Sequence, residues 1–435
     1  MFHWVTVARP NGVHVSSYSH IADAGVSTPT FPTMTAEFFE LGQTALSALR
    51  QDIAEAAAAT SATHNQLVAA ATLLRQATAE PGSESSNRLL DAARRIAVVS
   101  IEQSPFGMQC EFDDPGHESP LDVFRRMGDI CGQHCCWTLE AHVLESVGLL
   151  ASVGSITAGR VLLSRVANNN ARSNWDAAAG MLDAFSDGPY TGFSELRLRA
   201  QYHRSASVRN RGNWNDAQKI HESILAEAGD RHRAIRARSL SALGGIWANR
   251  EVFDRAVQYM WEAYGLTKGT GSIVESGGLG DISLVLMHAG YVAEARAAMV
   301  SLMHRASPYL LYILLGGYAE ASGKLGDRAG VEWATDQTIA LARRSYQARS
   351  AAQTLFECAL ALDAVDNTAR GEEVMRRALR MAERHGFYDL PFRAEQAKAK
   401  PASSRAPLGQ GSTAILDELS QMTPTTLPET LEHVG

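Results

Sequence analysis

The sequence predicts an all-α protein built as a solenoid, a row of antiparallel helix pairs stacked side by side. Three observations predict this class. Alanine is frequent while aromatic residues make up only 7% of the 435 residues, which favours helices that pack closely through small side chains. A small residue recurs at intervals close to 39 residues. An apolar stripe with helical spacing follows each recurrence.

The repeat is clearest where an aromatic residue stands three positions before a small one. The segments are Trp175-Asp176-Ala177-Ala178, Trp214-Asn215-Asp216-Ala217 and Phe253-Asp254-Arg255-Ala256. The equivalent small position recurs in seven consecutive units, at Glu140, Ala178, Ala217, Ala256, Ala295, Val331 and Gly371. The intervals are 38, 39, 39, 39, 36 and 40 residues, so the units follow one another without a break.

Each unit has the pattern of two helices. Mostly apolar residues follow the small position after four and seven residues, which marks one stripe of a second helix. Twelve residues before the small position stand Gly128, Val166, Ser205, Gly244, Ser283, Ala319 and Ala359, most of them with little or no side chain. We expect the first and second helices of a unit to approach closely there. One pair cannot bury both of its faces, whereas a stack of pairs can.

These positions resemble the tetratricopeptide repeat family, and the fourth unit matches best, with Leu243, Gly244, Trp247, Ala256, Met260 and Ala263. The resemblance covers roughly residues 121 to 387 and implies a right-handed α-solenoid whose first helices line a concave, peptide-binding face. This chain departs from the family in its period, which is longer than the family's, and in the largely missing closing proline. Glu140 and Gly371 replace alanine in the outer units.

The flanking segments have different compositions. Residues 1–33 are predicted to be an irregular tail, which leaves open whether the functional start is Met1 or Met34, and residues 34–104 a set of N-terminal helices that cap the array. Residues 105–120 are predicted to be a polar loop, and residues 388–435 a linker and flexible C-terminal tail. The alternative for that tail is a short helix over Ala414 to Met422 that docks on the solenoid through Ile415, Leu416 and Leu419.

Charge and cysteine content limit the classes of partner. The formal net charge is -7, so we expect no direct nucleic-acid partner and no membrane partner. The sequence has no apolar run long enough for a transmembrane helix and no secretory leader pattern. Five cysteines, an odd number, are typical of a reducing compartment, so a cytoplasmic location is expected.

Two groups of polar residues could carry chemistry. Cys131, His134 and Cys135 share one helical face if that segment is helical, with Cys110 or His142 available as a fourth zinc ligand. The repeat register instead places Cys131 inside a first helix and Cys135 and Cys136 in the turn after it. The acidic loop group of Asp113, Asp114, His117 and Glu118 could bind a divalent ion. We interpret both groups as structural and predict no catalytic residue, metal or cofactor.

The favoured site is the concave face. Counting inward positions of the first helices in units two to four gives a basic, amide-rich set: Arg160, Asn170, Arg199, Tyr202, Arg209, Asn210, Arg238 and Asn249. Arginine forks and asparagine amides suit a carboxylate or an extended peptide backbone. In units five and six the corresponding positions are nearly uncharged, which predicts an apolar contact with a partner or another subunit; they are Gly277, Gly280, Leu284, Met287, Ile313 and Gly316.

The sequence therefore predicts a non-enzymatic protein- or peptide-binding scaffold or regulatory sensor, whose partner carries an acidic segment or a C-terminal carboxylate. Two alternatives remain. One is a metal-dependent enzyme that uses the Cys/His cluster or the acidic loop. The other is a structural module that forms homo-oligomers.

Overall fold

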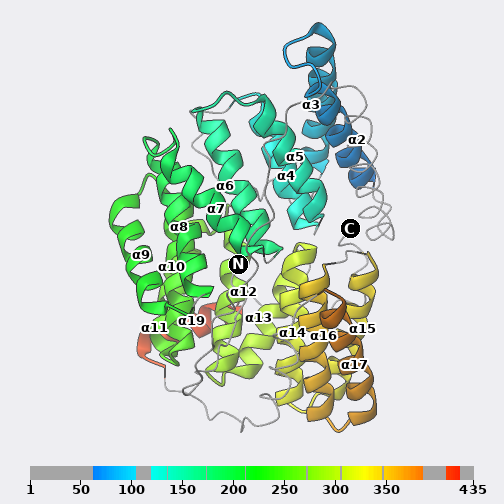
Figure 1. The fold of residues 1–435 in the computed structure, drawn as a ribbon. Helices are drawn as coiled ribbons and strands as arrows, with labels where there is room; N and C mark the ends of the chain where they lie inside the picture. The colour runs from blue at the N-terminus through cyan, green and yellow to red at the C-terminus, as the bar shows by residue number, and fades with distance from the viewer. Residues whose placement is uncertain are drawn as a thin grey trace, which may run out of the picture.

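A computed structural model describes residues 62–103, 119–134, 136–172, 174–210, 212–270, 273–303, 306–344, 347–385 and 408–421. Within these ranges every regular element is a helix, and successive helices pack against one another (Figure 1). The predicted class, an α-solenoid of antiparallel helix pairs, is confirmed.

Every repeat unit contributes a first helix, called helix A, and a second, called helix B. The A helices are α4 (Asp122–Gln133), α6 (Ile156–Ala171), α8 (Ser194–Asn210), α10 (Arg233–Asn249), α12 (Ile273–His288), α14 (Pro308–Lys324) and α16 (Ala348–Ala364). The B helices are α5 (Trp137–Leu150), α7 (Trp175–Asp187), α9 (Trp214–Ala228), α11 (Phe253–Thr267), α13 (Val292–Met303), α15 (Arg328–Arg344) and α17 (Thr368–His385).

The predicted repeat register matches these helices. All seven B helices begin three residues before the predicted small position, and that position is buried in every unit, including Glu140 and Gly371. One backbone hydrogen bond recurs with the same spacing. The N–H four residues before the small position donates to the carbonyl five residues earlier, from Cys136 to Cys131 in the first unit and from Asn367 to Leu362 in the last. This bond closes the end of each A helix.

The small residues of the A helices lie where the two helices of a unit meet, as predicted. In the fourth unit a Cβ added to Gly244 would stand 2.5 Å from Met260 Cγ and 3.0 Å from the carbonyl oxygen of Ala256. Glycine is therefore required for the close crossing of α10 and α11.

The A helices form the inner layer of the array. Each described A helix contacts the A helix of the next unit, from α4 through to α16. In Figure 1 the pairs wind from the cyan α4 and α5, through the green α8 to α11, to the orange α16 and α17. The path curls back on itself, since Trp137 at the start of α5 meets Tyr309 in α14 with ring centroids 5.7 Å apart.

Two helices precede the repeats. The helices α2 (Ala62–Ala77) and α3 (Glu84–Gln103) pair with each other, and α2 packs on α5 while α3 packs on α4. Leu67, Leu74 and Ala97 share one apolar cluster with α4 and α5. The predicted tail (1–33), residues 34–61 of the predicted N-terminal helices and the loop residues 105–118 lie outside the described residues.

A final helix, α19 (Gln410–Gln421), packs against two B helices, α11 and α13. Ile415, Leu416 and Leu419 are buried there, so the helical, docked alternative for the C-terminal segment is the one that the structure shows. Among the described helices, none combines the length and the apolar character that a membrane crossing requires.

The prediction for units five and six is corrected. Gly280, Leu284 and Gly316 were expected to present an apolar contact to a partner or another subunit, but the chain itself buries them. An added Cβ at Gly280 would lie 3.4 Å from Leu310 Cδ1, and one at Gly316 would clash with the Glu357 side chain. The glycines that suggested a smooth surface instead allow α12, α14 and α16 to pack directly on one another.

Candidate ligand-binding face of the A helices

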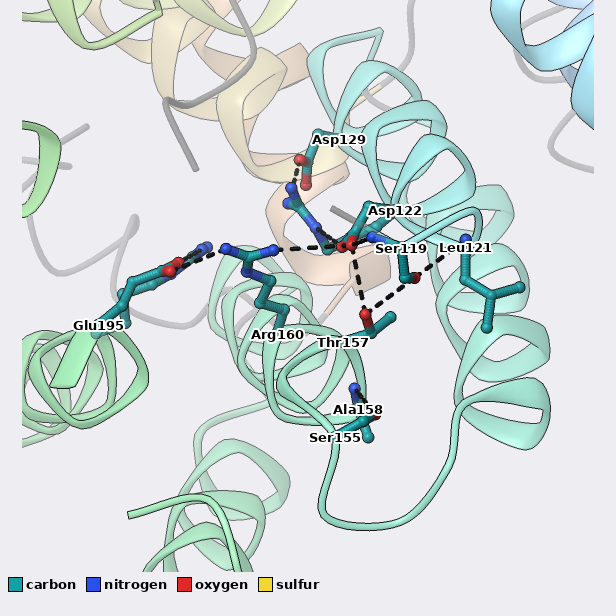
Figure 2. A network of polar contacts seen from close by, with 11 residues as sticks. Ser119, Leu121, Asp122, Asp129, Ser155, Thr157, Ala158, Arg160 and Glu195 are labelled. Atoms are coloured by element: carbon teal, nitrogen blue, oxygen red, sulfur yellow. Dashed lines mark hydrogen bonds and ion pairs between the residues drawn. The ribbon is translucent and has the colours of Figure 1, made fainter. Parts of the chain in front are cut away.

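An ionic network joins the first three A helices and contains two of the predicted site residues. Arg160 of α6 is fully buried, and its guanidinium donates a 2.9 Å hydrogen bond to Glu195 of α8. Its other terminal nitrogen lies 3.7 Å from Asp122 of α4. Figure 2 shows Arg160 between these two carboxylates. Arg199, one turn after Glu195, lies 3.5 Å from the other carboxylate oxygen.

The network is held in place at its α4 end. Asp122 accepts hydrogen bonds from the Ser119 N–H at 2.8 Å and from the Thr157 hydroxyl at 3.3 Å. The buried Arg125 joins Asp122 at 3.4 Å and Asp129 at 3.0 Å. Three guanidinium groups thus face three carboxylates, and buried charges that are paired in this way fix the helices relative to one another. The structure places Arg160 in this framework, where it orients the neighbouring helices.

The second group of site residues lies on α8 and α10. Tyr202 of α8 is half-buried, and the guanidinium carbon of Arg238 on α10 lies 5.9 Å from the centre of its ring. The other edge of Tyr202 packs against His221 of α9, with ring centroids 5.7 Å apart. His221 in turn contacts the Ser205 hydroxyl at 2.9 Å. Burial, together with the positive charge of Arg209, lowers the pKa of His221 to about 3.

The neutral, buried His221 therefore provides a firm backing for Tyr202. Tyr202 and Arg238 come from adjacent A helices and form a combined aromatic and cationic surface.

Arg209 lies near the end of α8 and is half-buried. Burial lowers the pKa of its guanidinium, while the negative charge of Asp281 on α12 acts in the opposite direction. Asp281 is itself buried, and burial raises its pKa to about 6 against the opposing influence of Arg209. This part of the A-helix face thus contains a positive and a negative group that are both poorly solvated, so electrostatic interactions there are stronger than in water.

The predicted asparagines are less uniform. Asn170 in α6 is half-buried, and within the described residues its side-chain oxygen has no hydrogen-bond partner. A buried acceptor of this kind gains from any donor that reaches it, such as a peptide N–H. Asn249 is half-buried at the end of α10. Asn210 ends α8, and its side chain lies outside the described residues.

The Cys/His cluster and the acidic loop group, the two alternative sites, do not lie on the A-helix face among the described residues. Cys131 is fully buried in the apolar cluster of α2 to α5, and burial raises the pKa of its thiol well above the ordinary range. Cys136 is buried in the same cluster, and Cys135 and the acidic loop group lie outside the described residues. In the part of the chain that the structure describes, no three His, Cys, Asp or Glu side chains are grouped to hold a metal ion.

The sequence prediction missed the acidic members of this face. Asp122 and Asp281 lie in units one and five, outside units two to four, from which the inward positions were counted, and Glu195 is not one of the positions counted. Glu195 could have been found, since it precedes Arg199 by four residues, the spacing at which a helix pairs opposite charges. Asp122 precedes Arg125 by three residues, which is also such a spacing. The contact of Asp122 with Arg160 and the interaction of Asp281 with Arg209 join different units, and no local spacing indicates them.

No protein-family model and no curated protein matches this chain. Among solved structures, the TPR-like repeats of a putative kinesin light chain from Podosopora anserina are 17% identical, cover 43% of this chain and 95% of that one, and give a TM-score of 0.35. The apo form of the quorum sensor NprR from B. thuringiensis is 16% identical, covers 73% of this chain and 87% of that one, and gives 0.42.

These similarities are too weak to bear on function, so the fold assignment rests on the chain's own helices. Among the described helices, seven pairs share one register, one buried position three residues into each B helix and one recurrent hydrogen bond at the end of each A helix. The A helices form the inner layer. The chain is a tetratricopeptide-like helical-repeat protein.

Proposed function

We propose that this chain is a binding module, not an enzyme, and that the A helices of units two to four hold a peptide segment of a partner protein. The segment carries an acidic side chain or a C-terminal carboxylate. Arg209 and Arg238 contact the carboxylate, and Tyr202 contacts an apolar group beside it. A module of this kind suits a scaffold or a signalling regulator that acts through its partner.

One observation carries the proposal. Arg238 stacks over Tyr202 from the neighbouring A helix, so two residues that the repeat register predicted to face the same groove do meet. Asn170 supports it with a buried oxygen that lacks a donor among the described residues. Extended peptides need acceptors for their N–H groups as well as donors for their carbonyls.

The roles of the arginines differ. Arg160 is engaged by two carboxylates and Arg199 by one, so both belong to the framework that positions the face. Arg238 lies over the ring of Tyr202, and Arg209 interacts electrostatically with the same residue, so we assign the recognition to these two. Replacing the two pairs of arginines therefore has different consequences for stability and for binding.

The test is a screen of fluorescent peptides with acidic or neutral sequences, each made with a free and an amidated C-terminus. The screen compares the intact protein with an Arg209→Ala, Arg238→Ala double variant. We expect the intact protein to prefer acidic or free-carboxylate peptides, with affinity that falls as salt is raised. The double variant should lose at least tenfold in affinity while its circular dichroism and thermal midpoint stay close to those of the intact protein.

An Arg376→Ala, Arg380→Ala variant is the matched control, because it removes the same charge from exposed positions of the B helix α17. If the control loses as much affinity as the groove variant, binding reflects net charge alone and the site is wrong. If no peptide binds the intact protein and light scattering shows a stable oligomer, the oligomerisation alternative replaces this proposal.

A further inference from the structure

The C-terminal helix α19 does not cap the end of the solenoid. It skips the last two units and lies on α11 and α13, the B helices of units four and five (Figure 1). B helices form the outer layer, so this contact is on the opposite side from the A-helix face. Residues 386–407 join α17 to α19 along the chain.

The first turn of α19 is recognised by one carboxylate of α11. Gly409, at the N-terminal end of the helix, donates its N–H to Asp254 Oδ1 at 2.8 Å, and the Ser412 hydroxyl donates to the same oxygen at 2.7 Å. A glycine has no side chain to cap its own helix, so Asp254 supplies the missing acceptor from another element. Its negative charge also faces the positive end of the helix dipole.

Asp254 is oriented for this task. Gln258, one turn later in α11, donates to Asp254 Oδ2 at 3.0 Å, which leaves Oδ1 to face Gly409 and Ser412. The remainder of the contact is apolar. Ile415, Leu416 and Leu419 are 6%, 8% and 4% exposed and belong to the main core cluster of the chain. The contact therefore has a polar end that sets the register and an apolar stripe that buries surface.

From these contacts we propose that the surface between α11 and α13 is a second, separate peptide-binding site, which takes an amphipathic helix, and that residues 408–421 of the same chain are its ligand. The segment binds as a tethered but separable ligand, whose apolar stripe joins the core cluster when it is docked. A helix that fits this site starts with a glycine whose N–H faces Asp254. A serine follows three residues later, and apolar residues stand six, seven and ten residues after the glycine.

The test uses the full chain and a fluorescent peptide of residues 406–423. In a variant with Leu416→Asp and Leu419→Asp the tethered helix can no longer bury its stripe, so the site is open. The peptide should bind this variant. It should bind the wild-type chain at least tenfold more weakly, because the tethered segment competes at an effective concentration on the order of millimolar.

Recognition by Asp254 is tested in the open variant. Adding Asp254→Ala should reduce peptide affinity at least tenfold. Adding Asp176→Ala, the residue at the same position of the second unit, should leave it unchanged. A peptide with Ser412→Ala should bind more weakly to the open variant. Asp254→Ala should then reduce the affinity of this peptide by less than it reduces the affinity of the unmodified peptide, because Ser412 and Asp254 form a hydrogen bond with each other.

Three outcomes would overturn the proposal. They are failure of the peptide to bind the folded open variant, equal binding to open and wild-type chains, and a wild-type dimer that becomes a monomer in the open variant. The last would show that α19 is exchanged between copies. If the open variant does not fold, a second variant with a protease site within residues 395–404 replaces it. After cleavage, its C-terminal fragment should exchange with labelled peptide, and a fragment that never exchanges contradicts separability.

Discussion

Trp137 and Tyr309 meet edge to face, with ring centroids 5.7 Å apart and planes at 87°. Trp137 begins the B helix of the first unit, whereas Tyr309 lies in the first turn of the A helix of the sixth. In a simple solenoid each unit contacts only its neighbours. This pair therefore closes the curled array across its opening and links two regions that the repeat pattern keeps apart.

We expect the Trp137–Tyr309 contact to limit opening of the array. Trp137→Ala and Tyr309→Ala should each lower the free energy of unfolding. A double-mutant cycle should give a coupling of about 0.5–1.5 kcal/mol, the usual range for an aromatic pair. Small-angle scattering should show a larger radius of gyration for either variant. If the two substitutions change the free energy of unfolding additively and leave the radius of gyration unchanged, the contact does not limit opening of the array.

The close crossing of α10 and α11 predicts opposite effects for two glycine substitutions. Gly244→Ala should destabilise the chain by about 1–3 kcal/mol, because its Cβ would press on Met260 and on the Ala256 carbonyl. Gly180→Ala in the exposed face of α7 has nothing within 4 Å and should stabilise by up to about 1 kcal/mol through helix propensity. The denaturant midpoints of the two variants measure these effects. If Gly244→Ala leaves the midpoint unchanged, α10 and α11 can move apart at little cost in free energy.

The turn between helices A and B predicts a stabilising substitution. Glu251 has φ +62°, while Gly212 and Gly290, at the equivalent positions of adjacent units, have φ +82° and +90°. A residue with a side chain is strained in this left-handed conformation. Glu251→Gly should therefore raise stability by about 0.5–1 kcal/mol, and Gly290→Ala should lower it by a similar amount. Thermal midpoints that move in the reverse directions would contradict the turn geometry.

Much of the fold could be predicted because its determinants are local and repeated. An aromatic residue three positions before a small one, clear in units two to four, was extended in both directions at a spacing of about 39 residues, and this placed all seven B helices. Glu140 and Gly371 replace alanine in the outer units, but their distance from the neighbouring units was enough to place them at the correct position of the repeat. Helical period and close packing act over short distances, so sequence spacing reports them directly.

The contacts between distant units could not be predicted in this way. Trp137 has the same place in its unit as Trp175, yet its contact with Tyr309 depends on the accumulated curvature of the units between them, which no local pattern reports. Asp254 likewise has the same position as Asp176, and only Asp254 caps α19. Arg160 was predicted to face a ligand, but its burial depends on acids from two other units.

The buried framework of the A-helix face gives a prediction that separates stability from binding. Arg160→Ala would leave Asp122 and Glu195 without a shared partner in a poorly solvated place, which typically costs about 3–5 kcal/mol. Arg238→Ala should cost far less, since Arg238 is half-buried and stacks on a ring. Urea unfolding of the two variants side by side measures the difference. Equal losses would place Arg238 in the framework as well.

Glu140 links stability to pH, because it stands at the small position of the first B helix and is 5% exposed. Burial raises the pKa of its carboxyl well above the ordinary 4.5, while a hydrogen bond from the Asn168 side chain acts in the opposite direction. The geometry of that bond is good, with Asn168 Nδ2 at 2.8 Å from Glu140 Oε2. Within the described residues, Asp129 reinforces the elevation and Arg172 opposes it.

The sign of the pH effect follows from this elevation. Between the unfolded pKa and the raised folded pKa, the folded state binds more protons, so stability falls as pH rises through that window. Each unit of elevation corresponds to about 1.4 kcal/mol. Glu140→Gln keeps the acceptor for Asn168 and has no proton to lose, so its stability should match wild type near pH 4.5 and exceed it increasingly toward neutral pH. Urea titrations of both proteins from pH 4.5 to 8 measure this. Parallel profiles would show that the Glu140 carboxyl is solvated and ionised within the fold.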